Sequence, residues 1–319
     1  MKYRALGKTG LTVSEVGFGC APLGNQYGDI DDNEGIRAIH AAIDHGINFF
    51  DTSTYYGKGV SETRLGKALI GKRDQVIVAT KGGRFDVPLE TGFDFSYDGI
   101  IQMCEASLKR LQTDVIDVYQ LHDIEFGDKQ QVINEAIPAV QKLKSDGKVR
   151  FIGVTGFPLP LLWEMIETQD LDVTLSYSHY NLINQTLNEE LVPAVKAKGL
   201  GLINGSVTNM GLLTDQGPQR WHPAPETAKV AAAEAAAYCR SRGASLPQLA
   251  IQFALQNPHV DVTLLGVRTE AELQSSIPLL DSKPDPELLE AILAILEPIA
   301  NTTWPSGRPE NYEPNAVSV

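Results

Sequence analysis

The chain has few cysteines and no metal-binding or disulfide pattern. Its 319 residues include three cysteines, Cys20, Cys104 and Cys239, which are widely separated. An odd, scattered set gives neither a disulfide framework nor a zinc motif. A reducing compartment is therefore expected. The polar N-terminus has no apolar signal region, so we expect a cytoplasmic protein.

Positive charge is also scarce, and long apolar runs are absent. The 27 Lys and Arg residues face 40 Asp and Glu residues, which gives a net charge of −13. Such a balance disfavours nucleic acids and anionic membranes as partners. No apolar run reaches the roughly 20 residues of a membrane-spanning helix. The composition predicts an acidic enzyme that acts on a small molecule as a monomer or small homo-oligomer, with no nucleic acid and no membrane as partner.

Strand and helix patterns alternate along the whole chain. Strands are expected at 47–51, 76–80, 115–121, 151–155, 173–177, 201–204 and 262–265. Helices are expected from about 32, and at 61–70, 97–111, 130–144, 160–168, 187–198, 226–242, 246–256, 270–279 and 286–299. This alternation implies a parallel sheet. Because no G-x-G-x-x-G follows a strand, a closed (β/α)8 TIM barrel of the α/β class is favoured over a doubly wound sheet.

No break in composition marks a domain boundary. We therefore expect one barrel domain over 1–319, with extra C-terminal helices. The residues from about 305 to 319 are polar and rich in proline, and are expected to lie against the surface or to be loose.

Three of the expected strands end at an ionisable residue, and a tyrosine follows the first of them. The strand ends are Asp51, Lys81 and His122, and the tyrosine is Tyr56. Neighbouring parallel strands would bring these four side chains into one pocket. A lysine ammonium favours the phenolate form of a tyrosine, and a carboxylate keeps that lysine charged. A plain salt bridge beside a core tyrosine explains each residue singly, whereas the set indicates an acid–base site.

The residues around this site resemble the aldo-keto reductases. The segment 50–57 reads FDTSTYYG and is followed by Ser61-Glu62, which is similar to the most specific signature of that family. The opening residues 6–19 resemble its N-terminal hairpin and first strand. The resemblance covers nearly the whole chain. It implies a TIM barrel without a Rossmann motif and NAD(P)-dependent hydride transfer between a carbonyl and an alcohol.

The family resemblance also implies catalytic roles. Tyr56 would transfer the proton, Lys81 would lower its pKa and Asp51 would pair with Lys81. His122 would hydrogen-bond the reacting oxygen. No metal is expected, because a metal-dependent barrel needs His and carboxylate ligands at several strand ends, and only His122 fits.

Several strings resemble the L-galactose dehydrogenase subgroup of the family. They are LHDIEFG at 121–127, FIGVTG at 151–156, MGLLTDQGP at 210–218, WHPA at 221–224 and WPSG at 304–307. They imply the oxidation of an aldose such as L-galactose at C1 to the lactone. Two alternatives are an NADPH-dependent carbonyl or aldehyde reductase of broad specificity and a non-catalytic channel β-subunit, which shares the barrel and the tetrad.

Cofactor contacts follow from the resemblance as well. The matching positions are Thr155, Tyr177, Ser206, Thr208, Met210, Gly266, Arg268, Glu272 and Ser276. Gly156 replaces the usual carboxamide-binding Asn, and Gly205 replaces an aromatic residue that often stacks on the nicotinamide. A carboxylate at Glu272 would repel a 2′-phosphate, whereas Arg268 would attract it. We expect NAD in preference to NADP.

Substrate contacts are expected on the rim loops. Tyr55, Asp123 and Trp221 supply polar and aromatic groups of the kind that a sugar site needs. Asp123 could accept from two sugar hydroxyls or could be a solvated loop acid. Trp221 could face the sugar or could pin its loop by packing.

Overall fold

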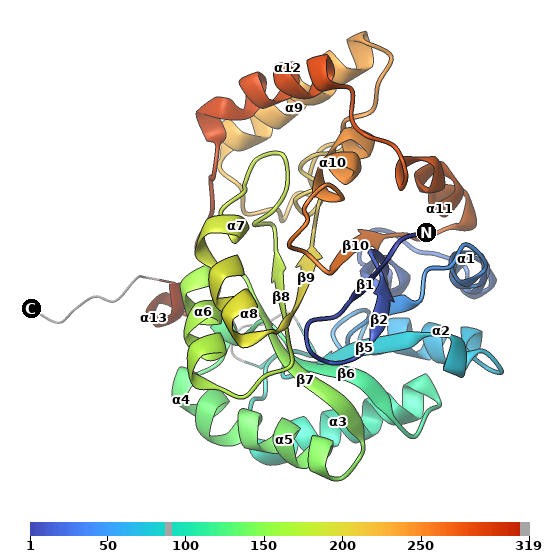
Figure 1. Cartoon of the computed structure of the whole chain (residues 1–319), viewed down its shortest axis with the longest axis vertical. Helices are drawn as coiled ribbons and strands as arrows, with labels where there is room; N and C mark the ends of the chain where they lie inside the picture. The colour runs from blue at the N-terminus through green and yellow to red at the C-terminus, as the bar shows by residue number, and fades with distance from the viewer. Residues whose placement is uncertain (87–90, 313–319) are drawn as a thin grey trace, which may run out of the picture.

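A closed barrel of parallel strands forms the centre of the computed structural model, which describes residues 1–86 and 91–312 (Figure 1). The strands pair in the order β10-β3-β4-β5-β6-β7-β8-β9. Their bounds are β3 (Val16–Gly19), β4 (Phe49–Asp51), β5 (Ile77–Gly82), β6 (Ile116–Leu121), β7 (Val149–Gly156), β8 (Val173–Tyr177), β9 (Gly201–Gly205) and β10 (Val262–Gly266). The predicted (β/α)8 barrel is therefore confirmed.

An antiparallel hairpin precedes the barrel, as expected. It pairs β1 (Tyr3–Ala5) with β2 (Thr12–Ser14). Its turn lies against the start of β9, where Lys8 N–H donates to Gly199 O at 2.9 Å. Leu6 and Leu11 pack with the side chains inside the barrel, so the hairpin covers the end opposite the strand carboxyl ends.

Helices surround the barrel at nearly all the predicted positions. They are α1 (Asp32–Asp44), α2 (Val60–Ala68), α3 (Tyr97–Leu111), α4 (Lys129–Gln131), α5 (Ile137–Ser145), α6 (Leu159–Thr168), α7 (Leu187–Glu190), α8 (Val192–Lys198), α9 (Glu226–Ser241), α10 (Leu246–Ala254), α11 (Glu270–Ser276), α12 (Pro286–Leu296) and α13 (Pro309–Tyr312). Short 3₁₀ turns are η1 (Ala21–Gly24), η2 (Arg73–Gln75), η3 (Ile124–Phe126), η5 (Ile277–Leu279) and η6 (Glu297–Ile299).

Two predicted helices are divided, and prolines explain both divisions. The helix expected at 130–144 contains a π-helical turn, η4 (Val132–Ala136), just before Pro138. The helix expected at 187–198 breaks at Leu191, before Pro193. Proline has no N–H to donate and its ring crowds the preceding turn, so a regular helix cannot run through it unchanged.

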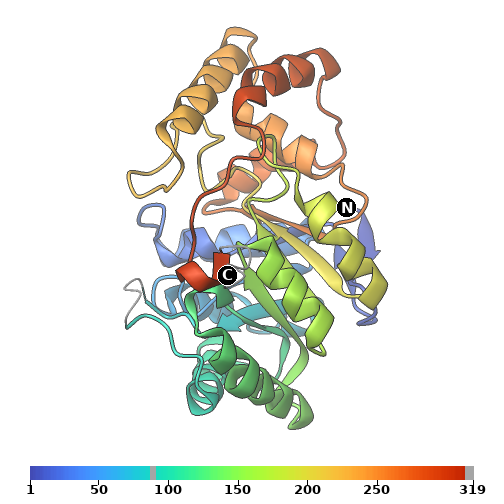
Figure 2. The same ribbon diagram turned by 90° about the vertical axis from the view of Figure 1, so that its left-hand side faces the viewer.

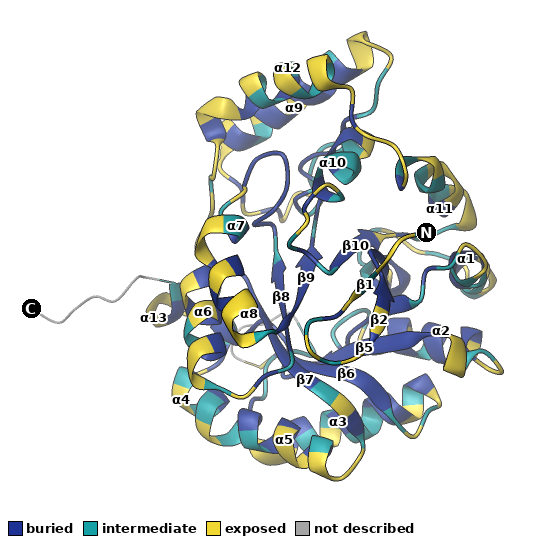
Figure 3. Cartoon of the chain, viewed as in Figure 1, coloured by how far each residue is buried: buried dark blue, intermediate teal, exposed yellow. Residues whose placement is uncertain are grey.

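Both faces of the barrel strands are buried, which explains their continuous apolar runs (Figure 3). Phe49 and Val118 point into the barrel, whereas their neighbours Phe50 and Tyr119 pack against the helices. This period of two puts Asp51, two residues after Phe49, on the inward side at the top of the barrel.

The C-terminal segment leaves the helical layer and crosses to the far side of the barrel. Helices α9 and α12 pack together in a second apolar cluster. After α12 the chain runs down to α13, which lies beside η3 and α6 (Figure 2). Residues 305–312 are therefore docked, and 313–319 lie outside the described residues. No helix in the described ranges is long and apolar enough to cross a membrane.

Candidate active site

The ends of three neighbouring strands bring Asp51, Lys81 and His122 together, and Tyr56 joins them from the loop after β4. Lys81 Nζ donates to Asp51 Oδ1 at 2.5 Å and lies 3.4 Å from the Tyr56 hydroxyl. The rings of Tyr56 and His122 meet edge to face, with centroids 5.8 Å apart. The structure thus gathers the four residues predicted to be catalytic.

Two glycines allow the backbone to hold Tyr56 in place. A Cβ on Gly24 would lie 2.4 Å from the carbonyl carbon of Tyr56, and one on Gly57 would lie 2.5 Å from Gly24 O. Gly57 also has a φ of +65°, which favours glycine. The turn η1 therefore packs directly on the chain at Tyr56.

Burial and charge set the protonation of this group. Burial alone would lower the pKa of Lys81, but the Asp51 carboxylate and the Tyr56 phenol together raise it, so Lys81 stays an ammonium. Burial raises the pKa of Tyr56 above its ordinary value. The Lys81 ammonium acts against burial and lowers the Tyr56 pKa, as expected, but by less than burial raises it.

His122 is neutral and is held by a residue that the sequence did not single out. Burial lowers its pKa to about 3. Ser53 Oγ lies 2.9 Å from His122 Nδ1 and also accepts the Tyr55 N–H at 3.0 Å. His122 Nε2 lies 3.7 Å from Asp123 Oδ2. Ser53 thus holds Nδ1 of His122, and Nε2 remains available at the barrel mouth.

Gln120 and Arg84 also join the site without having been predicted. Gln120 Nε2 donates to Asp51 Oδ2 at 3.4 Å from within the barrel. The guanidinium of Arg84 donates to the carboxylate of Asp123. Gln120 could have been found from the period of two that puts it on the same face as His122. Arg84 lies three residues beyond Lys81, in a loop that carries no strand pattern.

The predicted substrate residues lie around the same mouth. The Tyr55 ring lies 5.9 Å from His122 and 6.1 Å from Tyr56, between ring centroids. Asp123 is buried, so it is not a solvated loop acid. Trp221 is 56% exposed and lies 6.5 Å from the ring of Tyr27, and this exposure leaves its indole accessible to a ligand.

Thr155 and Tyr177, two of the residues expected to contact the cofactor, already have protein partners. Thr155 Oγ1 accepts the Asp123 N–H at 2.9 Å. The Tyr177 hydroxyl donates to Glu125 Oε1 at 3.1 Å. Glu125 is fully buried, and burial with the nearby Asp123 charge raises its pKa to about 8.

The loop after β9 offers unpaired hydroxyls at two of the positions expected to contact the cofactor. Neither Ser206 nor Thr208 makes a side-chain hydrogen bond to another described residue, and both are half-buried. Ser206 and Met210 have φ values of 58° and 52°, so this segment turns sharply at the barrel mouth. Free hydroxyls at a strand carboxyl end fit a phosphate-bearing cofactor.

Arg268, which would favour NADP, and Glu272, which would favour NAD, form an ion pair with each other. Arg268 Nη2 donates to Glu272 Oε1 at 2.6 Å, and Arg268 N–H donates to Glu272 Oε2 at 2.8 Å. Gly266 ends β10, and the Ser276 hydroxyl donates to Glu272 O at 3.1 Å. The Arg268 charge is therefore neutralised by the carboxylate beside it.

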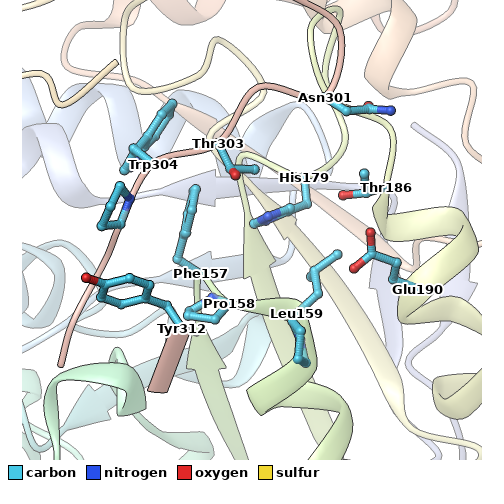
Figure 4. Close-up of a pocket in the computed structure, with 12 residues that line it drawn as sticks. Phe157, Pro158, Leu159, His179, Thr186, Glu190, Asn301, Thr303, Trp304 and Tyr312 are labelled. Carbon is cyan, nitrogen blue, oxygen red and sulfur yellow. The ribbon is translucent and has the colours of Figure 1, made fainter. Parts of the chain in front are cut away.

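A cavity of about 400 Å³ lies beyond the tetrad (Figure 4). It is lined by residues after β7 and β8 and by the C-terminal segment, among them Phe157, His179 and Trp304. None of the four tetrad residues lines it.

Within residues 1–86 and 91–312, no group of three or more His, Cys, Asp or Glu side chains could hold a metal ion.

Comparison with known proteins gives a matching family model and several similar enzymes. The model of the aldo/keto reductase family matches residues 15–297. The chain is 43% identical to L-galactose dehydrogenase of Arabidopsis thaliana over 98% of this chain and 99% of the relative. It is 33% identical to D-threo-aldose 1-dehydrogenase of Pseudomonas sp, covering 84% and 90%.

A further relative and a solved structure are also similar to this chain. The chain is 31% identical to D-arabinose 1-dehydrogenase of Saccharomyces cerevisiae, over 93% of this chain and 95% of the relative. The holo form of an aldo-keto reductase from Bacillus halodurans superposes with a TM-score of 0.76 at 26% identity, covering 98% of this chain and 100% of that one.

Proposed function

The chain belongs to the aldo/keto reductase family and is an oxidoreductase, and on that premise we propose that it oxidises an aldose such as L-galactose at C1 to the lactone. The observation that carries the chemistry is the position of Lys81 Nζ between Asp51 and the Tyr56 hydroxyl. The substrate class is supported by the relatives named for L-galactose, D-threo-aldose and D-arabinose.

In this proposal Tyr56 accepts the proton of the C1 hydroxyl while the C1 hydride leaves. The Lys81 ammonium stabilises the phenolate, and Asp51 keeps Lys81 charged and oriented. His122 donates from its free ring nitrogen to the reacting oxygen and aligns it with Tyr56. In the opposite direction Tyr56 returns the proton to the carbonyl oxygen.

A nicotinamide cofactor would supply the hydride acceptor. Ser206 and Thr208 would bind its phosphates with their unpaired hydroxyls. We propose NAD rather than NADP, because Glu272 forms an ion pair with the guanidinium of Arg268 and adds a carboxylate that disfavours a 2′-phosphate. The alternative is a broad carbonyl reductase that uses NADPH, in which Arg268 would leave Glu272 to bind the phosphate.

The direct test is absorbance at the reduced-nicotinamide band with NAD⁺ or NADP⁺ and a panel of L- and D-aldoses. Reduction of NAD⁺ with L-galactose or a stereochemical relative such as L-fucose is the expected result. The absence of reduction with every sugar, together with NADPH-dependent loss of simple aldehydes, would replace this proposal with the carbonyl reductase. A Tyr56→Phe preparation serves as the blank for contaminating dehydrogenases.

A further inference from the structure

Arg84 is held at the barrel mouth by aromatic rings. Its guanidinium carbon lies 3.8 Å from the ring centroid of Tyr55 and 5.4 Å from those of Phe93 and Phe126. A planar guanidinium stacks well on such ring faces. Tyr55 in turn touches the rings of Tyr56 and His122, so Arg84 lies one side chain away from the acid–base pair.

The carboxylate of Asp123 fixes the other side of Arg84. Nη1 of Arg84 donates to Asp123 Oδ2, and the same oxygen lies 3.7 Å from His122 Nε2. Thr155 Oγ1 lies 3.4 Å from Asp123 Oδ1. Asp123 is therefore occupied on both oxygens, which leaves less of it for direct contact with a sugar than the sequence indicated.

Arg84 keeps donors that the protein does not use. A guanidinium has five N–H groups, and among the described residues only Nη1 has a hydrogen-bond partner. Its Nε is buried without a partner. Nη2 also has no partner among the described residues but is not fully buried, so it is the donor that a ligand oxygen can reach.

From this geometry we propose that Arg84 recognises the hydroxyl groups of the substrate and so makes the site select a polyhydroxylated aldose over a carbonyl compound without hydroxyls. The proposal rests on the oxidoreductase function proposed above for the same site. Asp123 acts as the positioning residue that holds Arg84 beside His122. Because the Arg84–Asp123 pair is neutral overall, the pocket suits a neutral sugar that both donates and accepts hydrogen bonds.

A matched pair of aldehydes isolates this role. Glyceraldehyde and propanal have the same three-carbon chain, and only glyceraldehyde carries hydroxyls. Their reduction can be measured whether or not any aldose is oxidised, so failure of the aldose proposal and failure of this one remain distinguishable. The wild type should prefer glyceraldehyde, and Arg84→Met should reduce that preference in kcat/KM about 10- to 100-fold, mainly through KM.

Two further variants test whether the preference for glyceraldehyde depends on the guanidinium of Arg84. Arg84→Lys keeps the charge but loses the planar fork, so it should restore only part of the preference. Lys58→Met removes an exposed cation that pairs with Asp86 on the same rim and should leave the preference unchanged. An equal fall with both aldehydes in Arg84→Met, or no wild-type preference for glyceraldehyde, would overturn the proposal. Nucleotide titration of each variant checks that the cofactor site is intact.

Discussion

The Ser53 hydroxyl lies 2.9 Å from Nδ1 of His122, and this contact assigns the tautomer of the ring. Ser53 Oγ already accepts the Tyr55 N–H, and its proton has no other hydrogen-bond acceptor among the described residues. The hydroxyl therefore donates to Nδ1. Since burial lowers the His122 pKa to about 3, the neutral ring carries its single proton on Nε2, where it can donate to a substrate oxygen.

Removal of that hydroxyl should slow the chemical step. In Ser53→Ala the ring can adopt the opposite tautomer, which leaves no donor toward the substrate. Loss of one such hydrogen bond is worth about 1 kcal/mol, so kcat should fall roughly fivefold to tenfold. Steady-state kinetics measures this. The control Thr54→Val removes a neighbouring buried hydroxyl that bonds Ser107 instead and should retain kcat. An unchanged kcat in Ser53→Ala would contradict the tautomer assignment.

Loss of the Tyr56 hydroxyl should affect chemistry and spare nucleotide binding. Tyr56→Phe keeps the ring that packs against His122 and removes only the proton-transfer group. We expect turnover to fall by at least about 10²- to 10⁴-fold, the usual contribution of general acid–base catalysis. The nucleotide dissociation constant, measured by fluorescence titration, should change less than about twofold. Normal turnover in this variant would show that another group moves the proton.

The oxidation rate should rise with pH. Oxidation needs Tyr56 without its proton, and burial raises the pKa of this phenol. Below that pKa the phenolate fraction grows about tenfold per pH unit, so kcat/KM should climb through the alkaline range without a plateau near neutrality. His122, with a pKa of about 3, adds no acidic limb above pH 5. A profile that is flat from pH 7 to 10 would place the proton transfer elsewhere.

The charge pair at Arg268 and Glu272 should control cofactor choice. Glu272→Gln retains an acceptor for the Arg268 N–H but releases the guanidinium from its ion pair. The free guanidinium should tighten NADP⁺ binding about tenfold, while NAD⁺ binding changes little. Calorimetric titration with each nucleotide measures both. Equal changes for the two nucleotides would mean that neither residue faces the 2′-position.

Sequence patterns were sufficient for the barrel and for the residues on its strands. The strands have few conformational choices, because both faces are buried and the period of two fixes which side chains point inward. Asp51, Lys81 and His122 could therefore be located from their position at strand ends. The proline-induced breaks at 191 and within 130–144 changed helix continuity without moving any of these residues.

Loop contacts could not be predicted in the same way. Arg84 and Glu125 lie in connections whose path depends on segments distant in sequence. Glu125, for example, meets Ser306 only because the C-terminal segment returns to η3. A sequence pattern also does not reveal where two backbone segments approach each other closely. Gly307 lies so near η3 that a Cβ on it would be 2.3 Å from Glu125 O.

Glu125 provides a pH-dependent test of how the C-terminal segment is held. Its Oε1 accepts from Tyr177, Ser306 and the Phe157 N–H, while Oε2 is buried with no partner among the described residues. The pKa of Glu125 in the folded protein, about 8, lies above the ordinary glutamate value of 4.5. Between these two values the folded state binds a proton that the unfolded state has lost.

The free energy of unfolding should therefore fall as pH rises from about 5 to about 8, by at most about 1.4 kcal/mol per pH unit, and level off above that. Glu125→Gln stays neutral and keeps an acceptor at Oε1, so it should not show this decline. Its Tm should exceed that of the wild type increasingly from pH 6 to pH 8.5. The control Glu164→Gln alters a partly exposed carboxylate that pairs with Lys129 and should follow the wild type. If Glu125→Gln and the wild type lose stability in parallel, the Glu125 carboxyl is ionised in the folded protein throughout this range.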